Sequence, residues 1–167
     1  KWLAIGDNQR YVTLWSAVTR KIEHQLRLDE YFVTSLAFSP DSRFLAVASA
    51  DKTVQILSVG EWNRLGLLAG HLGAVESVSW SPDGEHLYSA ARDGTVRLWH
   101  AEPGRLVRTI SCGHRHVSSV AVSSDGRWLA TTTPEGGARL WAVDPGRPAR
   151  DRHAHARSSC PPRSNWP

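Results

Sequence analysis

The sequence predicts an all-β protein of the β-propeller class, and two observations carry this prediction. First, one pattern of short apolar segments and turns recurs every 42 residues along the 167-residue chain. Second, the period from Gly70 to Trp99 holds three short apolar segments, separated by Ser-Pro-Asp-Gly and Arg-Asp-Gly. Pro, Asp and Gly provide the backbone angles of tight turns, so each period is a run of hairpins. Repeats of ~40–45 residues with four strands per unit are typical of propeller blades.

Three markers keep the 42-residue spacing independently of one another. One is a pair of residues that ends an apolar segment, one is a Ser-containing turn, and one is a valine that starts a segment. They are Leu14-Trp15, Ile56-Leu57, Leu98-Trp99 and Leu140-Trp141; the turns at 39–42, 81–84 and 123–126; and Val33, Val75 and Val117. Because chance does not hold three markers in register, the repeat is a property of the fold.

The motifs of one period resemble a WD40 repeat. They are the Gly-His start at 70–71, the Ser-Pro-Asp-Gly turn at 81–84 and the Asp-Gly-Thr-Val-Arg-Leu-Trp end at 93–99. The resemblance covers about residues 1–144. It implies a WD40-type β-propeller, in which each blade covers its neighbour and no single repeat buries its own apolar faces.

Four blades are expected in order along the chain, at about 1–27, 28–69, 70–112 and 113–144. The two central blades have all four strands. The first begins at its second strand and lacks the innermost one. The fourth should lack its outer strand, because residues 147–155 show no alternating apolar pattern. Since propellers have ~4–8 blades, two complete and two incomplete blades predict a partial propeller. The chain is then a fragment or truncated form, with the missing blades provided by the rest of a longer protein.

Residues 145–167 are predicted to form a disordered tail rich in Arg, Pro and Ser. The net charge of +4 arises there, from five arginines against Asp151, whereas residues 1–144 carry 15 basic and 15 acidic side chains. The sequence contains no run of about 18 apolar residues, which is what would predict a membrane span. The two cysteines, Cys112 and Cys160, make no disulfide framework. These observations favour an intracellular protein, cytoplasmic or nuclear.

The resemblance also implies a buried hydrogen-bond network in each blade, which makes the turn between the second and third strands rigid. Its members are the His of Gly-His, a Ser or Thr of the second strand, the turn Asp and the Trp of the third strand. In the third blade they are His71, Ser89, Asp93 and Trp99; in the fourth they are His114, Thr131, Glu135 and Trp141. The extra methylene of Glu135 should strain or loosen the fourth turn. The second blade has Asp51 but Val47 and Leu57, and the first has Gln9 at the Asp position.

Two groups of residues suggest chemistry, and we expect neither to perform it. His71, Ser89 and Asp93 could suggest a Ser-His-Asp hydrolase, but no Gly-x-Ser-x-Gly nucleophile motif accompanies them. A metal could be suggested by the cysteines together with His114, His116, His153 and His155, but no Cys-x-x-Cys occurs. Nor is there a phosphate-binding Gly-x-x-x-x-Gly-Lys-Ser/Thr loop. The prediction is therefore no catalysis, no metal site and no cofactor.

The resemblance implies a scaffold that binds other proteins through side chains on one rim, the edge formed by the loops between blades and the turns after the second strands. By position, the rim residues are Phe32, Thr34, Glu76, Arg92, His116, Ser118 and Pro134. The alternative is an RNA-binding or ribonucleoprotein component that uses the basic tail and rim. Against it, the tail has one aromatic residue, Trp166, and so no stacking platform. The partners themselves remain open.

Overall fold

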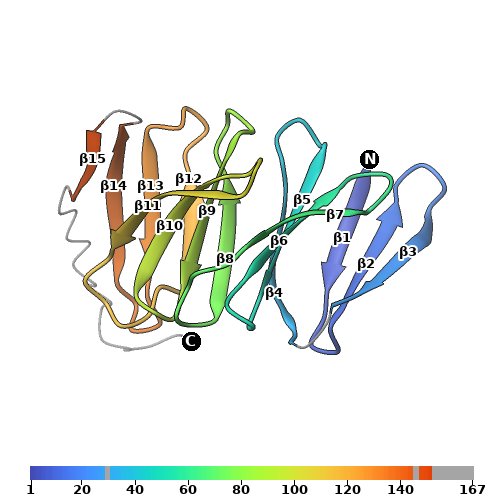
Figure 1. Ribbon diagram of the computed structural model, residues 1–167, viewed down its shortest axis with the longest axis horizontal. Coiled ribbons are helices and arrows are strands. Elements are labelled where there is room, and N and C mark those ends of the chain that lie inside the picture. The colour runs from blue at the N-terminus through green and yellow to red at the C-terminus, as the bar shows by residue number, and fades with distance from the viewer. Residues whose placement is uncertain (29–30, 145–146, 152–167) are drawn as a thin grey trace, which may run out of the picture.

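The computed structural model describes residues 1–28, 31–144 and 147–151. In these residues the chain forms strands and turns and no helix, so the all-β prediction is confirmed. The strands make four antiparallel sheets that stand side by side in sequence order (Figure 1). We call the sheets blades 1 to 4. No helix that could span a membrane occurs in the described part of the chain.

Each blade is a meander of neighbouring hairpins. Blade 1 contains β1 (Trp2–Gly6), β2 (Tyr11–Ser16) and β3 (Lys21–Arg27). Blade 2 contains β4 (Val33–Phe38), β5 (Phe44–Ser49), β6 (Val54–Ser58) and β7 (Arg64–Leu68). Blade 3 contains β8 (Val75–Trp80), β9 (His86–Ala91), β10 (Thr95–His100) and β11 (Arg105–Ser111). Blade 4 contains β12 (Ser119–Val122), β13 (Trp128–Thr132), β14 (Ala138–Asp144) and β15 (Arg147–Asp151).

The turns between first and second strands are closed by their own Ser and Asp side chains. In blade 2, the Ser39 hydroxyl donates to Asp41 at 2.6 Å and accepts from the Phe44 N–H at 2.9 Å. The Asp41 carboxylate also accepts from the Arg43 N–H at 3.0 Å. Blade 4 repeats this arrangement with Ser123 and Asp125. The repeated turn sequence therefore fixes the same hairpin in both blades.

The expectation that blade 4 lacks an outer strand is wrong. Strand β15 pairs antiparallel with β14, with Ala142 opposite Arg150 and Trp141 opposite Asp151. An outer strand is held by backbone hydrogen bonds on one side only, so it needs no alternating apolar pattern, and proline is tolerated there. The predicted tail therefore includes a strand, and residues 152–167, the rest of that prediction, lie outside the described residues.

The first strands of blades 2, 3 and 4 lie next to one another, with β8 between β4 and β12. Hydroxyl groups on these strands bond to the backbone of the next blade. The Ser35 hydroxyl accepts from the Val78 N–H at 3.3 Å, and the Ser77 hydroxyl accepts from the Val120 N–H at 3.2 Å. Small polar residues here satisfy backbone groups that would otherwise be buried without partners between the blades.

Blade 1 lacks an innermost strand among the described residues, as predicted, since its sheet begins at β1. No blade precedes blade 1 among the described residues, and the effect is visible at one repeat position. Leu45, Leu87 and Leu129 are completely buried, whereas their equivalent Leu3 is 53% exposed. Full burial of a leucine stabilises a fold by about 1.5–3 kcal/mol. Each blade thus depends on the blade before it to cover this position.

Candidate functional site

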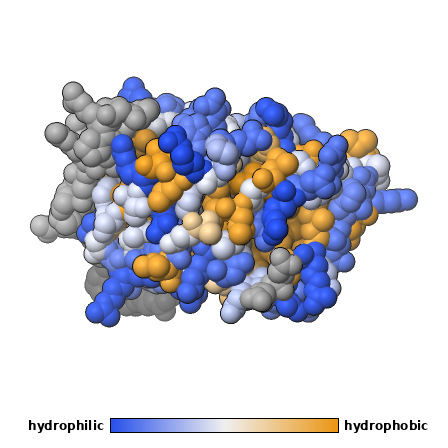
Figure 2. All heavy atoms as spheres, in the orientation of Figure 1, coloured by the Kyte–Doolittle hydropathy of each residue, from blue (hydrophilic) through white to orange (hydrophobic). Residues whose placement is uncertain are grey.

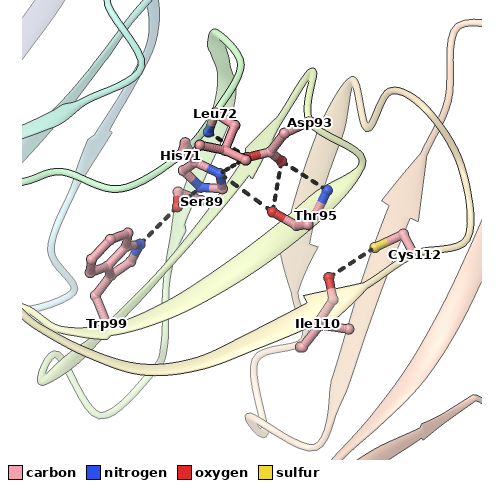
Figure 3. Close-up of polar contacts among 8 residues, drawn as sticks. All are labelled: His71, Leu72, Ser89, Asp93, Thr95, Trp99, Ile110 and Cys112. Atoms are coloured by element: carbon pink, nitrogen blue, oxygen red, sulfur yellow. Dashed lines mark hydrogen bonds and ion pairs between the residues drawn. The ribbon is translucent and has the colours of Figure 1, made fainter.

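The turn between β9 and β10 is held by a chain of hydrogen bonds (Figure 3). The indole N–H of Trp99 donates to the Ser89 hydroxyl oxygen at 2.8 Å. The Ser89 oxygen also lies 2.8 Å from Nε2 of His71, and Nδ1 of His71 lies 2.9 Å from Asp93 Oδ2. One direction satisfies every group: Trp99 donates to Ser89, Ser89 to His71, and His71 to Asp93. The structure therefore brings together all four residues predicted for blade 3.

The Asp93 carboxylate also holds the backbone around it. It accepts from the Leu72 N–H at 2.9 Å and from the Thr95 N–H and hydroxyl at 3.0 and 2.7 Å. Burial alone would raise the pKa of Asp93, but the hydrogen bonds from Thr95, His71 and Leu72 outweigh it and lower the pKa to about 2. Asp93 is thus a carboxylate at neutral pH, and it ties the loop before β8 to the turn after β9.

Burial lowers the pKa of His71 from 6.5, and Asp93 opposes this shift only in part. The imidazole is therefore neutral at pH 7, which agrees with Nε2 accepting from Ser89 and Nδ1–H donating to Asp93. Ser89 is completely buried and His71 is 4% exposed. A serine in that position cannot reach a substrate, so the Ser-His-Asp arrangement serves the turn.

Blade 4 keeps only one bond of this network. The Trp141 indole N–H donates to the Thr131 hydroxyl at 3.0 Å. Glu135 is exposed, and its pKa is lowered by its own backbone N–H and by Thr133. Among the described residues, no hydrogen bond joins His114 to Glu135 or Thr131. The longer side chain of Glu135 turns outward, so the carboxylate no longer links the two loops.

Blades 1 and 2 close the equivalent turns locally. In blade 2, Asp51 accepts from the Thr53 N–H at 2.8 Å and from its hydroxyl at 2.6 Å. In blade 1, Asp7 accepts from the N–H groups of Gln9 and Tyr11 at 2.9 and 2.8 Å. The sequence comparison placed Gln9 at the Asp position and missed Asp7. The signal was present, because Asp7 begins the turn and an Asp side chain readily caps a turn two residues ahead.

The predicted binding residues lie along one rim, which runs along the bottom of the view in Figure 1. We call it the connector rim: it consists of the loops between blades and the turns between second and third strands. Arg92 forms an ion pair with Glu76, and 58% of the Arg92 side chain is exposed against 20% for Glu76. Phe32 is 44% exposed on the loop before β4. Both are open to a partner.

The other predicted rim residues differ in what they contact. The Thr34 hydroxyl donates to the Val75 carbonyl at 2.6 Å and so joins blade 2 to blade 3. The Ser118 hydroxyl lies 3.1 Å from that of Thr132 within blade 4. His116 is half-buried, and its Nε2 is buried without a hydrogen-bond partner. Pro134 is exposed. Thr34 and Ser118 therefore stabilise the rim, whereas the Pro134 side chain is exposed to solvent.

Sequence reasoning missed the most exposed apolar side chain on this rim, Leu72, which is 81% exposed. Its backbone N–H is the one bound by Asp93, so the network holds the backbone of a residue whose apolar side chain is exposed to solvent. Gly73 makes this possible, because a Cβ there would lie 2.7 Å from the Asp93 nitrogen. The signal in the sequence was an apolar residue directly after Gly-His, in a loop where burial is not available.

The residues considered for a metal are not brought together. Cys112 is buried, while Cys160, His153 and His155 lie outside the described residues. Within the described residues, no group of three or more His, Cys, Asp or Glu side chains is placed to hold an ion. Apolar side chains also reach the surface elsewhere, as Figure 2 shows for one face, including Leu65 and Leu67 on the outer strand β7.

The family model described as "WD domain, G-beta repeat" matches residues 20–58, 62–100 and 104–142. The chain belongs to the WD40 family. Each match begins at the outer strand of one blade and ends with the third strand of the next, as in β3 to β6. The WD40 repeat in sequence therefore spans two blades in space, which explains how consecutive blades are joined.

A curated relative, the "Anaphase-promoting complex subunit cdc20" of Dictyostelium discoideum, is 32% identical over 66 residues. The alignment covers 38% of this chain and 13% of that protein. The chain thus matches a small part of the relative, and the likeness supports the WD40 repeat rather than a particular member of the family.

Proposed function

We propose that this chain is a non-catalytic platform for protein–protein interaction, and that a partner docks on the connector rim. WD40 repeats generally mediate complex assembly, and the matched relative is named as a subunit of a complex. The observation that carries the proposal is the combination of exposed Phe32, Leu72 and Arg92 on one rim of a rigid scaffold. Aromatic and arginine side chains are the types most often found as interface hot spots.

Rigidity is what makes these side chains suitable. A partner that binds an ordered surface does not have to order it first, and ordering costs about 0.5–1.5 kcal/mol per flexible side chain. Leu72 is positioned by Asp93, and Glu76 is positioned to orient Arg92. We further propose an intracellular location. The alternative is an RNA-binding or ribonucleoprotein component that uses the basic tail and rim, and residues 152–167 of that tail lie outside the described residues.

The test compares single rim variants with a variant on the opposite rim. Arg92→Ala, Phe32→Ala and Leu72→Ser should each weaken partner binding by ~1–2 kcal/mol, which is about 5–30-fold, with little change in melting temperature. Glu85→Ala, on the exposed turn between β8 and β9, is the control and should bind as the wild type does. Partners are first captured from extract and identified, and their affinities are then measured with purified protein. If the rim variants bind normally and the Glu85 variant does not, the proposed face is wrong.

A further inference from the structure

Two histidines face each other on the opposite rim of blade 3, away from the connector rim. His86 begins β9 and His100 ends β10, and the two residues are directly paired across the strands. Their ring centroids are 4.3 Å apart, with the rings inclined by 46°. Side chains directly opposite on antiparallel strands share one face of the sheet. The register of the hairpin therefore brings together two imidazoles that are fourteen residues apart in the sequence.

Asp83 fixes how His86 presents its ring. Its Oδ2 lies 2.8 Å from His86 Nδ1, while its Oδ1 accepts from the backbone N–H groups of Glu85 and His86 at 2.8 and 3.1 Å. Because a carboxylate oxygen accepts this bond, the imidazole donates from Nδ1, and the lone pair of Nε2 is available. A carboxylate bonded to the outer nitrogen of a histidine is the usual support of a metal-binding imidazole.

The charges beside His100 favour a cation. A hollow of about 430 Å³ lies beside His100, and its lining includes four acidic residues and one arginine. They are Asp41, Asp83, Glu85, Glu102 and Arg43. The guanidinium of Arg43 lies 3.8 Å from the carboxylate of Asp41, which offsets its charge. A concave surface with one predominant sign of charge raises the local concentration of counter-ions.

We propose that His86 and His100 bind one divalent transition-metal ion of the Zn²⁺ type, with Asp83 as a positioning residue. Because Zn–N bonds are about 2.0–2.1 Å and zinc coordination is tetrahedral, two rings on one ion have centroids about 5 Å apart, so these rings need to separate by less than about 1 Å to bind one ion. Imidazole is a preferred ligand of such ions. No third protein ligand is placed among the described residues, so water completes the coordination. This site lies on the rim opposite the proposed docking surface and is independent of it.

The experiment titrates the full 167-residue chain with zinc chloride by calorimetry. His86→Gln and His100→Gln should each weaken zinc binding at least tenfold. The matched control is the double variant His153→Gln/His155→Gln, which removes the His-Ala-His of the tail and should bind as the wild type does. Far-UV circular dichroism checks that each variant is folded. Absence of zinc binding in the wild type, or binding lost only in the tail variant, would overturn the proposal.

Asp83→Asn tests the positioning role separately. The amide keeps an oxygen for the turn but removes the charge, so zinc affinity should fall by about 10–100-fold, the usual effect of losing a supporting carboxylate. Nitrogen-15 NMR of the histidine ring gives a readout that turn stability alone would not move. The wild type should show the proton of His86 on Nδ1, and Asp83→Asn should show a mixture of both forms. An unchanged ring and an unchanged affinity would exclude the role of Asp83.

Discussion

Blades 3 and 4 carry equivalent turns, Ala-Arg-Asp-Gly-Thr at 91–95 and Thr-Pro-Glu-Gly-Gly at 133–137, and the acidic residues of the two turns make different contacts. In blade 3, Asp93 is bound by His71, Leu72 and Thr95 at once. In blade 4, Glu135 is exposed, and the bond between Trp141 and Thr131 is all that persists of the chain. The half of the network that lies inside the sheet is thus independent of the half that joins the two loops.

The difference shows that the carboxylate must lie within hydrogen-bond distance of both loops at once. Asp93 reaches the Leu72 N–H on one side and the Thr95 N–H on the other, and both distances are near 3 Å. In blade 4 the longer Glu135 is exposed, and Gly137 stands where Thr95 provides its hydroxyl in blade 3. Because both loops form the connector rim, blade 3 is, among the described residues, the only blade whose rim loops are bonded to each other through a buried carboxylate.

The largest effect that separates the two blades should come from their equivalent turn glycines. Gly94 and Gly136 have nearly the same positive φ, 78° and 85°. A Cβ on Gly94 would lie 2.0 Å from the His114 carbonyl oxygen in the next blade, whereas a Cβ on Gly136 would meet nothing within 4 Å. Both alanine variants should lose about 1–2 kcal/mol of stability, because a residue with a Cβ is strained at this positive φ. Gly94→Ala should lose roughly 1–3 kcal/mol more, because it forces two blades apart.

Urea unfolding of both variants measures this difference, since the strain that they share cancels. Equal losses would mean that the loop of blade 4 moves aside without cost. The contact between Gly94 and His114 would then be a loose one, and blades 3 and 4 would be joined mainly through their apolar core.

The next effect concerns the carboxylates themselves. Asp93→Ala removes the partner of a buried imidazole and of two backbone N–H groups, so it should destabilise the protein by about 1–3 kcal/mol. Glu135→Ala should change stability much less, as is usual for an exposed side chain. Thermal melts of the two variants give the ranking. Similar losses at both positions would show that Glu135 supports its turn in a way that its exposure does not indicate.

Much of this fold follows from the 42-residue period. Strands β1 to β14 lie in the predicted blades, because alternating apolar segments and Ser-Asp turns determine them locally. Strand β15 was missed, since an outer strand is held by backbone bonds that leave no mark on the side-chain pattern. Asp7 was missed because the repeat places the capping residue at position 9, whereas in blade 1 the turn is capped by the residue two positions earlier.

The sites were less predictable than the strands. The four network residues of blade 3 follow from the repeat, but the outward position of Glu135 depends on distances between two loops. The pairing of His86 with His100 depends on the register of a hairpin, which the sequence indicates only once the turn between the strands is placed. Exposure of Leu72 likewise depends on where its loop lies above the sheet.

The smallest predicted effect is the pH dependence that the two blades contribute. Burial lowers the pKa of His71 below 6.5, so between pH 6.5 and that lowered value the unfolded chain binds a proton that the folded chain does not. Unfolding free energy should therefore fall as the pH drops below about 6.5. His71→Gln should flatten this part of the profile. Asp93 adds a second pH dependence in a separate range, because its pKa is lowered from 3.8 to about 2 in the folded chain. The stability that Asp93 contributes is complete above pH 3.8 and is lost as the pH falls toward 2.

The matched control is His114→Gln in blade 4. That ring lies outside the network of blade 3, so His114→Gln should keep the fall in unfolding free energy that we assign to His71. Urea unfolding at several pH values in this range gives the three profiles. Parallel profiles for the wild type and His71→Gln would mean that His71 is protonated as readily in the folded chain as in the unfolded one. The neutral imidazole that accepts from Ser89 would then be the wrong form, and the donor chain of blade 3 would have to run in another direction.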